Sequence, residues 1–301
     1  DHKDKVEIYY QLAENYRNWN DQKSKYVEAL KYYDKILNNS YNMTLLMEED
    51  VLRSYLNTAY LTNRFMHDAT KALEVYNNGT NFYKDNLDNF EDLDEAKKNI
   101  SLIFYNMAII FEIKDEYMKA VNYYNKSIDI QPESSEAYNN LSIIYSDGKN
   151  GLLQNYKKSF DILMKGYKFN EALKNDPLTL YSIGYAYEYG QGVDHSFKNA
   201  IKYYELATKT DSISLQPFIA LSYLYSNGYG VNKDPAKAID LLSQGKILYE
   251  NANGNFYNFP QFKEDIIKHY DDIISSLNDL ENVNKGRESN KTPEFNLADS
   301  C

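Results

Sequence analysis

The chain has 301 residues, of which 43% are hydrophobic and 26% are charged, a balance that indicates a globular protein rather than a disordered one. Its net charge of −11 argues against a nucleic-acid binder, because contact with a phosphate backbone requires a basic surface. The single cysteine, Cys301, excludes an internal disulfide and a cysteine-ligated zinc site, and no apolar run is long enough to predict a transmembrane helix.

Residues 1–92 predict two pairs of helices. In each pair, apolar residues recur at three- and four-residue spacings, which is the period of one helical face. The first pair has Tyr9, Leu12, Ala13 and Tyr16 on its first helix and Ala29, Tyr33 and Ile36 on its second. The second pair keeps the spacing at Leu56, Tyr60, Ala69 and Leu73. It departs from the pattern at Arg53, where an aromatic residue is expected, and at Asn57, where a small residue is expected.

Residues 93–136 contain the clearest copy of this unit. Phe104, Met107, Ala108 and Phe111 share one helical face, and after a polar turn Ala120 and Tyr124 open the face of a second helix that ends before Pro132. Small residues at Ala108 and Ala120 allow the two helices to cross closely. The segment resembles a tetratricopeptide repeat, and the two preceding pairs resemble degenerate copies of it.

Residues 137–250 predict three more helix pairs, whose turns contain glycine. The segments YEYGQGVDHSFKNA (187–200) and YSNGYGVNKDPAKA (225–238) share a tyrosine, then Gly-x-Gly-Val, then an alanine. These turns resemble those of Sel1-like repeats. A phosphate-binding loop is the alternative, but the third glycine of a dinucleotide loop and the preceding strand are missing. We therefore expect Gly190 and Gly228 to end a helix, and Asp234 with Pro235 to begin one.

The resemblance implies an all-α fold, a right-handed α-solenoid of helix-turn-helix repeats. After Pro260 an amphipathic pattern predicts one further helix, so residues 251–280 are expected to cap the end of the solenoid. Residues 281–301 are polar and without periodicity, and we expect them to be disordered.

Catalytic, cofactor-binding and metal-binding residues are not predicted. The four histidines do not form a helical pair, and the sequence has neither a P-loop nor a Gly-x-Ser-x-Gly motif. An enzyme with part of its active site at the His195 turn remains an alternative, and it predicts a closed pocket with titratable groups there. A purely structural subunit of a large assembly is the third hypothesis.

Protein binding is the function that the resemblance implies, because such repeats build a long concave surface. Tyrosine is frequent, with 31 copies, and aromatic residues are typical anchors at interfaces. The positions expected on the concave face are Tyr105, Ile109, Asn139, Ile143, Tyr181, Tyr185, Ile219 and Tyr223.

The predicted role is therefore a non-catalytic scaffold or adaptor that binds proteins or peptide segments within a multiprotein complex. Sel1-like relatives include lumenal adaptors of membrane ubiquitin ligases in endoplasmic-reticulum quality control, and others are cytoplasmic regulators of enzymes. Asn-x-Ser/Thr triplets favour the secretory pathway over the cytoplasm; they begin at Asn38, Asn42, Asn78, Asn99, Asn125, Asn140 and Asn290. Because the chain begins with Asp1, we expect the natural protein to contain residues before it.

Overall fold

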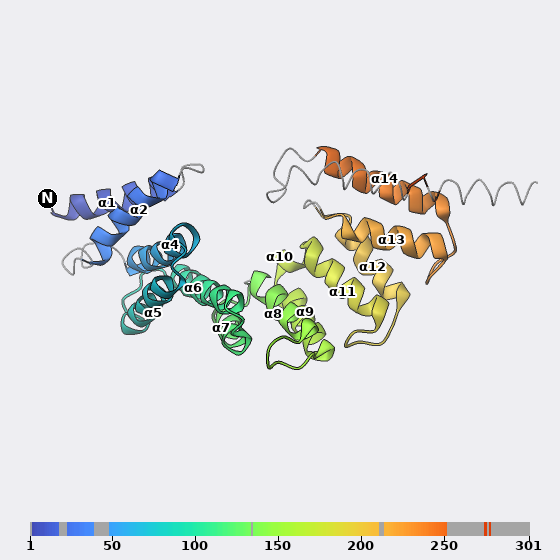
Figure 1. Cartoon of the computed structure of the whole chain (residues 1–301), viewed down its shortest axis with the longest axis horizontal. Coiled ribbons are helices and arrows are strands. Elements are labelled where there is room, and N and C mark those ends of the chain that lie inside the picture. The colour runs from blue at the N-terminus through green and yellow to red at the C-terminus, as the bar shows by residue number, and fades with distance from the viewer. Residues whose placement is uncertain are drawn as a thin grey trace, which may run out of the picture. The chain divides into compact units, whose positions relative to one another are not determined.

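A computed structural model describes most of the chain as helix-turn-helix pairs (Figure 1). The described residues are 2–17, 23–38, 48–133, 135–210 and 214–251, with Ile274, Ser275 and Leu277. Every regular element in these ranges is a helix, which confirms the predicted all-α fold. The chain divides into two compact units, Asp1–Asn170 and Glu171–Cys301.

The described residues of the N-terminal unit form four helical hairpins. Within each hairpin the two helices pack along their length, and each hairpin also packs against the next. The pairs are α1 (His2–Arg17) with α2 (Lys23–Leu37), α4 (Glu48–Met66) with α5 (Ala69–Asp85), α6 (Leu93–Ile113) with α7 (Tyr117–Ile130), and α8 (Ser135–Asp147) with α9 (Tyr156–Phe169).

The C-terminal unit repeats the same design. The short helix α10 (Glu171–Lys174) leads into two hairpins, α11 (Pro177–Tyr189) with α12 (Phe197–Ala207) and α13 (Gln216–Asn227) with α14 (Pro235–Asn251). The predicted cap at 251–280 and the tail at 281–301 lie outside the described residues, apart from Asn251, Ile274, Ser275 and Leu277. Leu277 packs against the core formed by α12, α13 and α14.

Polar side chains and glycines set the helix boundaries of the C-terminal unit, and those at Gly190, Gly228 and Asp234 were predicted from the sequence. Asp176 accepts a hydrogen bond from the backbone N–H of Thr179 ahead of Pro177, and Asp234 does the same for Lys237 ahead of Pro235. At the other ends, Gly190 and Gly228 adopt left-handed backbone conformations, with φ of 65° and 77°. These observations confirm the structural interpretation of both glycine-containing turns.

Small residues lie where the two helices of a hairpin cross. Ala13, Ala29, Ala108 and Ala120 are fully buried. Gly184 shows how tight the crossing is: a Cβ there would lie 2.7 Å from Cδ1 of Tyr204 on the partner helix. An alanine at Gly184 would thus displace the ring that occupies the centre of the hairpin.

A buried tyrosine follows each of several crossing alanines by one helical turn. Tyr33, Tyr76, Tyr124 and Tyr204 are all at most 1% exposed, so each hydroxyl must find a partner inside the protein. Tyr124 donates to Glu112 at 2.7 Å, and Tyr204 donates to Glu188 at 2.7 Å. Each of these glutamates lies on the first helix of the same hairpin, so the hydrogen bond connects the two helices.

The same hydroxyls also connect neighbouring hairpins. The side-chain amide of Asn140 on α8 donates to Tyr124 at 3.0 Å, and that of Asn57 on α4 donates to Tyr33 at 3.0 Å. Tyr33 itself donates to Glu14 on α1. The hydroxyl of a buried tyrosine therefore connects the two helices of its own hairpin and also connects that hairpin to its neighbour.

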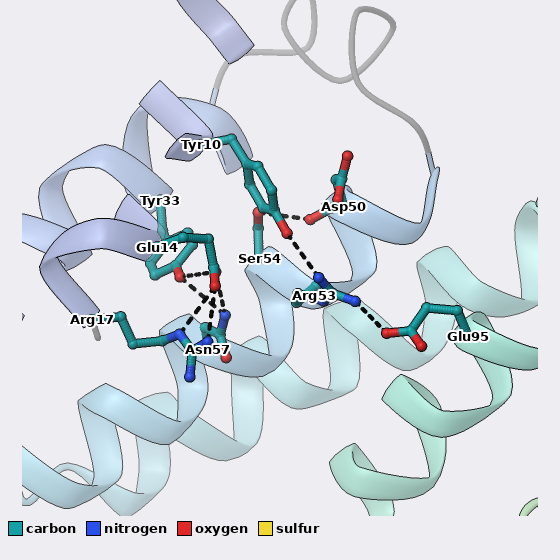
Figure 2. Close-up of polar contacts among 9 residues, drawn as sticks. All are labelled: Tyr10, Glu14, Arg17, Tyr33, Asp50, Arg53, Ser54, Asn57 and Glu95. Atoms are coloured by element: carbon teal, nitrogen blue, oxygen red, sulfur yellow. Dashed lines mark hydrogen bonds and ion pairs between the residues drawn. The ribbon is translucent and has the colours of Figure 1, made fainter. Parts of the chain in front are cut away.

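Figure 2 explains why the second repeat departs from the expected pattern. Asn57, in place of a small residue, donates to Glu14 at 2.8 Å in addition to Tyr33. Arg53, in place of an aromatic residue, pairs with Glu95 on α6 and donates to the Tyr10 hydroxyl on α1. Asn57 thus connects the second hairpin to the first, and Arg53 connects it to both the first and the third.

We expect Tyr204→Phe to lower the free energy of unfolding by about 1–3 kcal/mol, because the buried Glu188 carboxylate loses a hydrogen-bond donor. Urea denaturation followed by circular dichroism measures this loss. Tyr185→Phe is the matched control, since its hydroxyl makes no hydrogen bond with the described residues. Equal losses of unfolding free energy in both variants would contradict a stabilising role for the hydrogen bond between Tyr204 and Glu188.

Asp50 gives a prediction that depends on pH. Burial raises the pKa of its carboxyl group, against the opposing effects of a hydrogen bond from Tyr10 and the charge of Arg53; Glu49 and Glu14 raise it further. A raised pKa means that the folded state favours the protonated acid. The contribution to stability is then present at acidic pH and is lost as the pH rises through the folded-state pKa.

We therefore expect Asp50→Asn to be more stable than Asp94→Asn at neutral pH, with a difference that shrinks toward the ordinary aspartate pKa of 3.8. Both residues lie in the first turn of a helix, so both variants lose the same favourable interaction with the helix dipole, but Asp94 is exposed. Melting temperatures measured between acidic and neutral pH test this, and parallel curves for the two variants would rule it out.

Candidate protein-binding surface

The four predicted surface residues of the N-terminal unit are only partly available to a partner. Tyr105 and Ile109 on α6 are half-buried, and the Tyr105 hydroxyl accepts a hydrogen bond from Asn140 at 3.4 Å. Asn139 is buried, with 9% of its surface exposed, which corrects its predicted place on an open face. Ile143, one turn further along α8, is 43% exposed.

The four predicted residues of the C-terminal unit lie on α11 and α13, two helices that contact each other. Tyr181 and Tyr185 are one turn apart on α11, with ring centroids 6.1 Å apart. Tyr181 stacks on the buried Tyr204 at 5.5 Å and belongs to the edge of the core. Tyr185 is half-buried and its ring packs at a tilt against that of Tyr189, with centroids 4.4 Å apart, so the row of rings continues outward along the helix.

On α13, Ile219 is half-buried and Tyr223 is 49% exposed. The ring of Tyr223 meets that of Tyr229 edge-on at 5.8 Å. Tyr229 lies in the following turn and is 40% exposed, while Tyr189 is 56% exposed. We call the set Tyr181, Tyr185, Tyr189, Tyr223 and Tyr229 the tyrosine face.

Two members of the tyrosine face, Tyr189 and Tyr229, were not among the predicted site residues. Tyr189 follows Tyr185 by four residues and could have been found from the helical period. Tyr229 occupies the variable position of Gly-x-Gly-Val, where the sequence has no periodicity to place a side chain. Its position depends instead on a stack with Phe197 from the preceding hairpin, at 5.1 Å.

The glycines of the second turn allow that stack to form. Gly230 has a φ of 71°, and a Cβ there would lie 2.4 Å from the Cβ of Phe197. Any side chain at residue 230 would therefore push the turn off the preceding hairpin. The Gly-x-Gly-Val turn positions an aromatic side chain rather than a phosphate.

A carboxylate lies beneath the tyrosine face. Glu188 is 7% exposed and accepts hydrogen bonds from the hydroxyls of Tyr204 and Tyr189. Burial and then the charge of Glu188 raise the pKa of Tyr189 to about 12. The phenol of Tyr189 is consequently protonated at neutral pH, so this part of the face is an uncharged ring over a buried acid.

The His195 turn does not form the closed pocket that an active site there requires. The imidazole is exposed and packs edge-on against Phe197 at 4.3 Å. Among the described residues, histidine, cysteine, aspartate and glutamate side chains do not gather into a group that could hold a metal ion. In the same ranges, none of the helices combines the length and the apolar character needed to cross a membrane.

Comparison with known families decides the nature of the C-terminal repeats. The family described as Sel1 repeat matches residues 135–163, 177–209 and 219–245, which correspond to the hairpins α8/α9, α11/α12 and α13/α14. Three segments of this chain therefore match the Sel1 repeat family. The predicted Sel1-like character is thereby confirmed, and repeats of this kind typically act as protein-interaction scaffolds. No curated protein matches the chain in sequence.

Solved structures are similar to this chain at low sequence identity. A Sel1 repeat protein from Oxalobacter formigenes is 16% identical with a TM-score of 0.52, and the match covers 80% of this chain and 98% of that one. MamA from Desulfovibrio magneticus is 17% identical over 67% of this chain and 97% of its own, with a TM-score of 0.42. Human IFIT1 is 15% identical over 90% and 54% of the two chains, with a TM-score of 0.48.

The different packing of two surface tyrosines can be measured. We expect Tyr181→Ala to destabilise the protein by about 2–4 kcal/mol, because it empties space beside the core. Tyr223→Ala should change the free energy of unfolding by at most about 0.5 kcal/mol, because its ring is half exposed. Urea denaturation of the two variants measures both values, and a large loss in Tyr223→Ala would remove that residue from the candidate surface.

Proposed function

We propose that this protein is a non-catalytic scaffold that binds another protein through the tyrosine face of its C-terminal unit. The observation that carries the proposal is the exposure of Tyr189, Tyr223 and Tyr229, which are 56%, 49% and 40% accessible although each ring already packs on an aromatic neighbour. Tyrosines held in place by such packing lose little side-chain entropy on binding, which favours them as interface anchors.

The adjacent hairpins support this proposal because they present the rings from a rigid base. Tyr181 and Tyr204 anchor the inner end of the row, and the Glu188 hydrogen bonds fix α11 against α12. A surface that is ordered before binding spends less of its interaction energy on ordering itself. The three Sel1 repeats support a binding role. The tyrosine face also extends over two hairpins, and repeat proteins typically bind their partners on surfaces that several repeats build together.

A role in endoplasmic-reticulum quality control, or in another membrane-associated complex, is the finer form of this proposal and rests on the resemblance alone. The structure limits where glycans could be attached. Asn38 and Asn78 are exposed, whereas Asn99 is only 4% exposed and Asn140 is hydrogen-bonded to Tyr124. A glycosidase-sensitive shift that disappears in Asn38→Gln with Asn78→Gln would favour the lumenal role, and its absence would favour a cytoplasmic regulator.

Site-specific cross-linking tests the binding surface directly. A photoreactive phenylalanine analogue at Tyr223 should form covalent adducts with another protein in cells that express the full chain. The same analogue at Tyr60, which is 41% exposed on α4 of the N-terminal unit, is the matched control. Mass spectrometry identifies the adducts. If the Tyr223 position gives no adduct beyond those seen at Tyr60, the tyrosine face is not the binding surface.

A further inference from the structure

Lysine side chains cover aromatic rings in many places in this protein. Lys158 lies over Tyr145 at 4.3 Å, Lys237 lies over Tyr225 at 4.1 Å, and Lys35 lies over both Tyr9 and Tyr32 at about 5 Å. Further pairs are Lys25 with Tyr16, Lys119 with Phe111, Lys126 with Phe104 and Tyr123, Lys149 with Tyr117, and Lys202 with Tyr203. A cation above a ring face is attracted by the electron density of the ring.

The tyrosine face differs from all of these rings. Within the part of the chain that the structure describes, no lysine or arginine lies over Tyr185, Tyr189, Tyr223 or Tyr229. The sequence of the two helices explains this difference. The only charged residue of α11 is Glu188, and α13 has none, so neither helix can supply a cation to its own face.

The partners of Glu188 also differ from those of Glu14, a comparable acid in the N-terminal unit. Glu14 accepts a hydrogen bond from the buried Tyr33, as Glu188 does from Tyr204, but Glu14 is paired with Arg17 at 2.8 Å. Among the described residues Glu188 has hydroxyl donors and no cation within ion-pair distance. Glu188 therefore has no ion pair within the described residues, and its carboxyl group lies near the hydroxyls of Tyr189 and Tyr223.

We infer that the tyrosine face binds a basic segment of the partner protein, with lysine or arginine side chains placed over Tyr189 and Tyr223 and attracted by Glu188. This inference rests on the proposed function and names the chemistry of the partner. Three features favour a cation over an apolar side chain: exposed tyrosines, a buried acid without a counter-ion among the described residues, and the absence of lysine and arginine from α11 and α13.

A peptide pair separates charge from shape. The probe is a fluorescent peptide in which lysine and arginine alternate with glycine. Its control replaces lysine by norleucine and arginine by citrulline, which keeps the size of each side chain and removes its charge. Fluorescence polarisation with the full chain should show binding of the basic peptide only, and that binding should weaken as salt is added.

Three variants locate the binding. Tyr223→Leu and Glu188→Gln should each weaken the affinity for the basic peptide about five- to tenfold, whereas Tyr60→Leu in the N-terminal unit should leave it unchanged. Glutamine at residue 188 can still accept the hydrogen bond from Tyr204, so the hairpin should be retained. If circular dichroism shows that Glu188→Gln is unfolded, Tyr223→Leu, at an exposed position, decides the question.

The outcomes separate this inference from the proposed function. Equal binding of the neutral and basic peptides, or basic-peptide binding that Tyr223→Leu leaves unchanged, would overturn the basic partner. If the peptide assay fails in this way but the cross-linking experiment still captures a partner at Tyr223, the tyrosine face remains an interface, and it binds an uncharged segment. If both the peptide assay and the cross-linking experiment fail, the tyrosine face is not an interface.

Discussion

The hydrogen bond from a buried tyrosine to a glutamate of the partner helix is the interaction on which the arrangement of these hairpins depends. Three rings that make this hydrogen bond, Tyr33, Tyr124 and Tyr204, are completely inaccessible to solvent, so their hydroxyl groups cannot be left to water. A phenylalanine in each place would fill similar space without fixing the direction in which a neighbour must lie. The hydroxyl does fix it, because the acceptor has to be at one point of the adjacent helix.

This constraint connects the core to the surface of the C-terminal unit. Glu188 is needed beneath Tyr204, and the tyrosines of α11 follow one another by single helical turns from that point outward. A carboxylate that serves the interior therefore lies directly under an exposed row of rings. The packing of the core and the proposed binding surface share residues, so the polarity of the surface is determined partly by the requirements of the core.

Much of the fold could be predicted from sequence because its signals are local. The helical period, the crossing alanines, the left-handed glycines at Gly190 and Gly228 and the Asp234–Pro235 helix start all depend on neighbours in the chain. Arg53 and Asn57 looked like losses of the pattern for the opposite reason. Their partners, Glu95 on α6 and Tyr33 on α2, lie more than a helix away, and no spacing rule connects them.

The candidate surface was harder to predict for a similar reason. Ile143 is 43% exposed, but Asn139, one turn before it, is buried, so a position in the repeat does not fix exposure by itself. Tyr229 was missed because it depends on Phe197 of another hairpin. That same contact has a consequence for how the array can change. Because Phe197 of one hairpin packs against Gly230 in the turn of the next, a single hairpin is not an independent module. A duplication or exchange that preserves the fold must carry the second helix of one repeat together with the turn of the next.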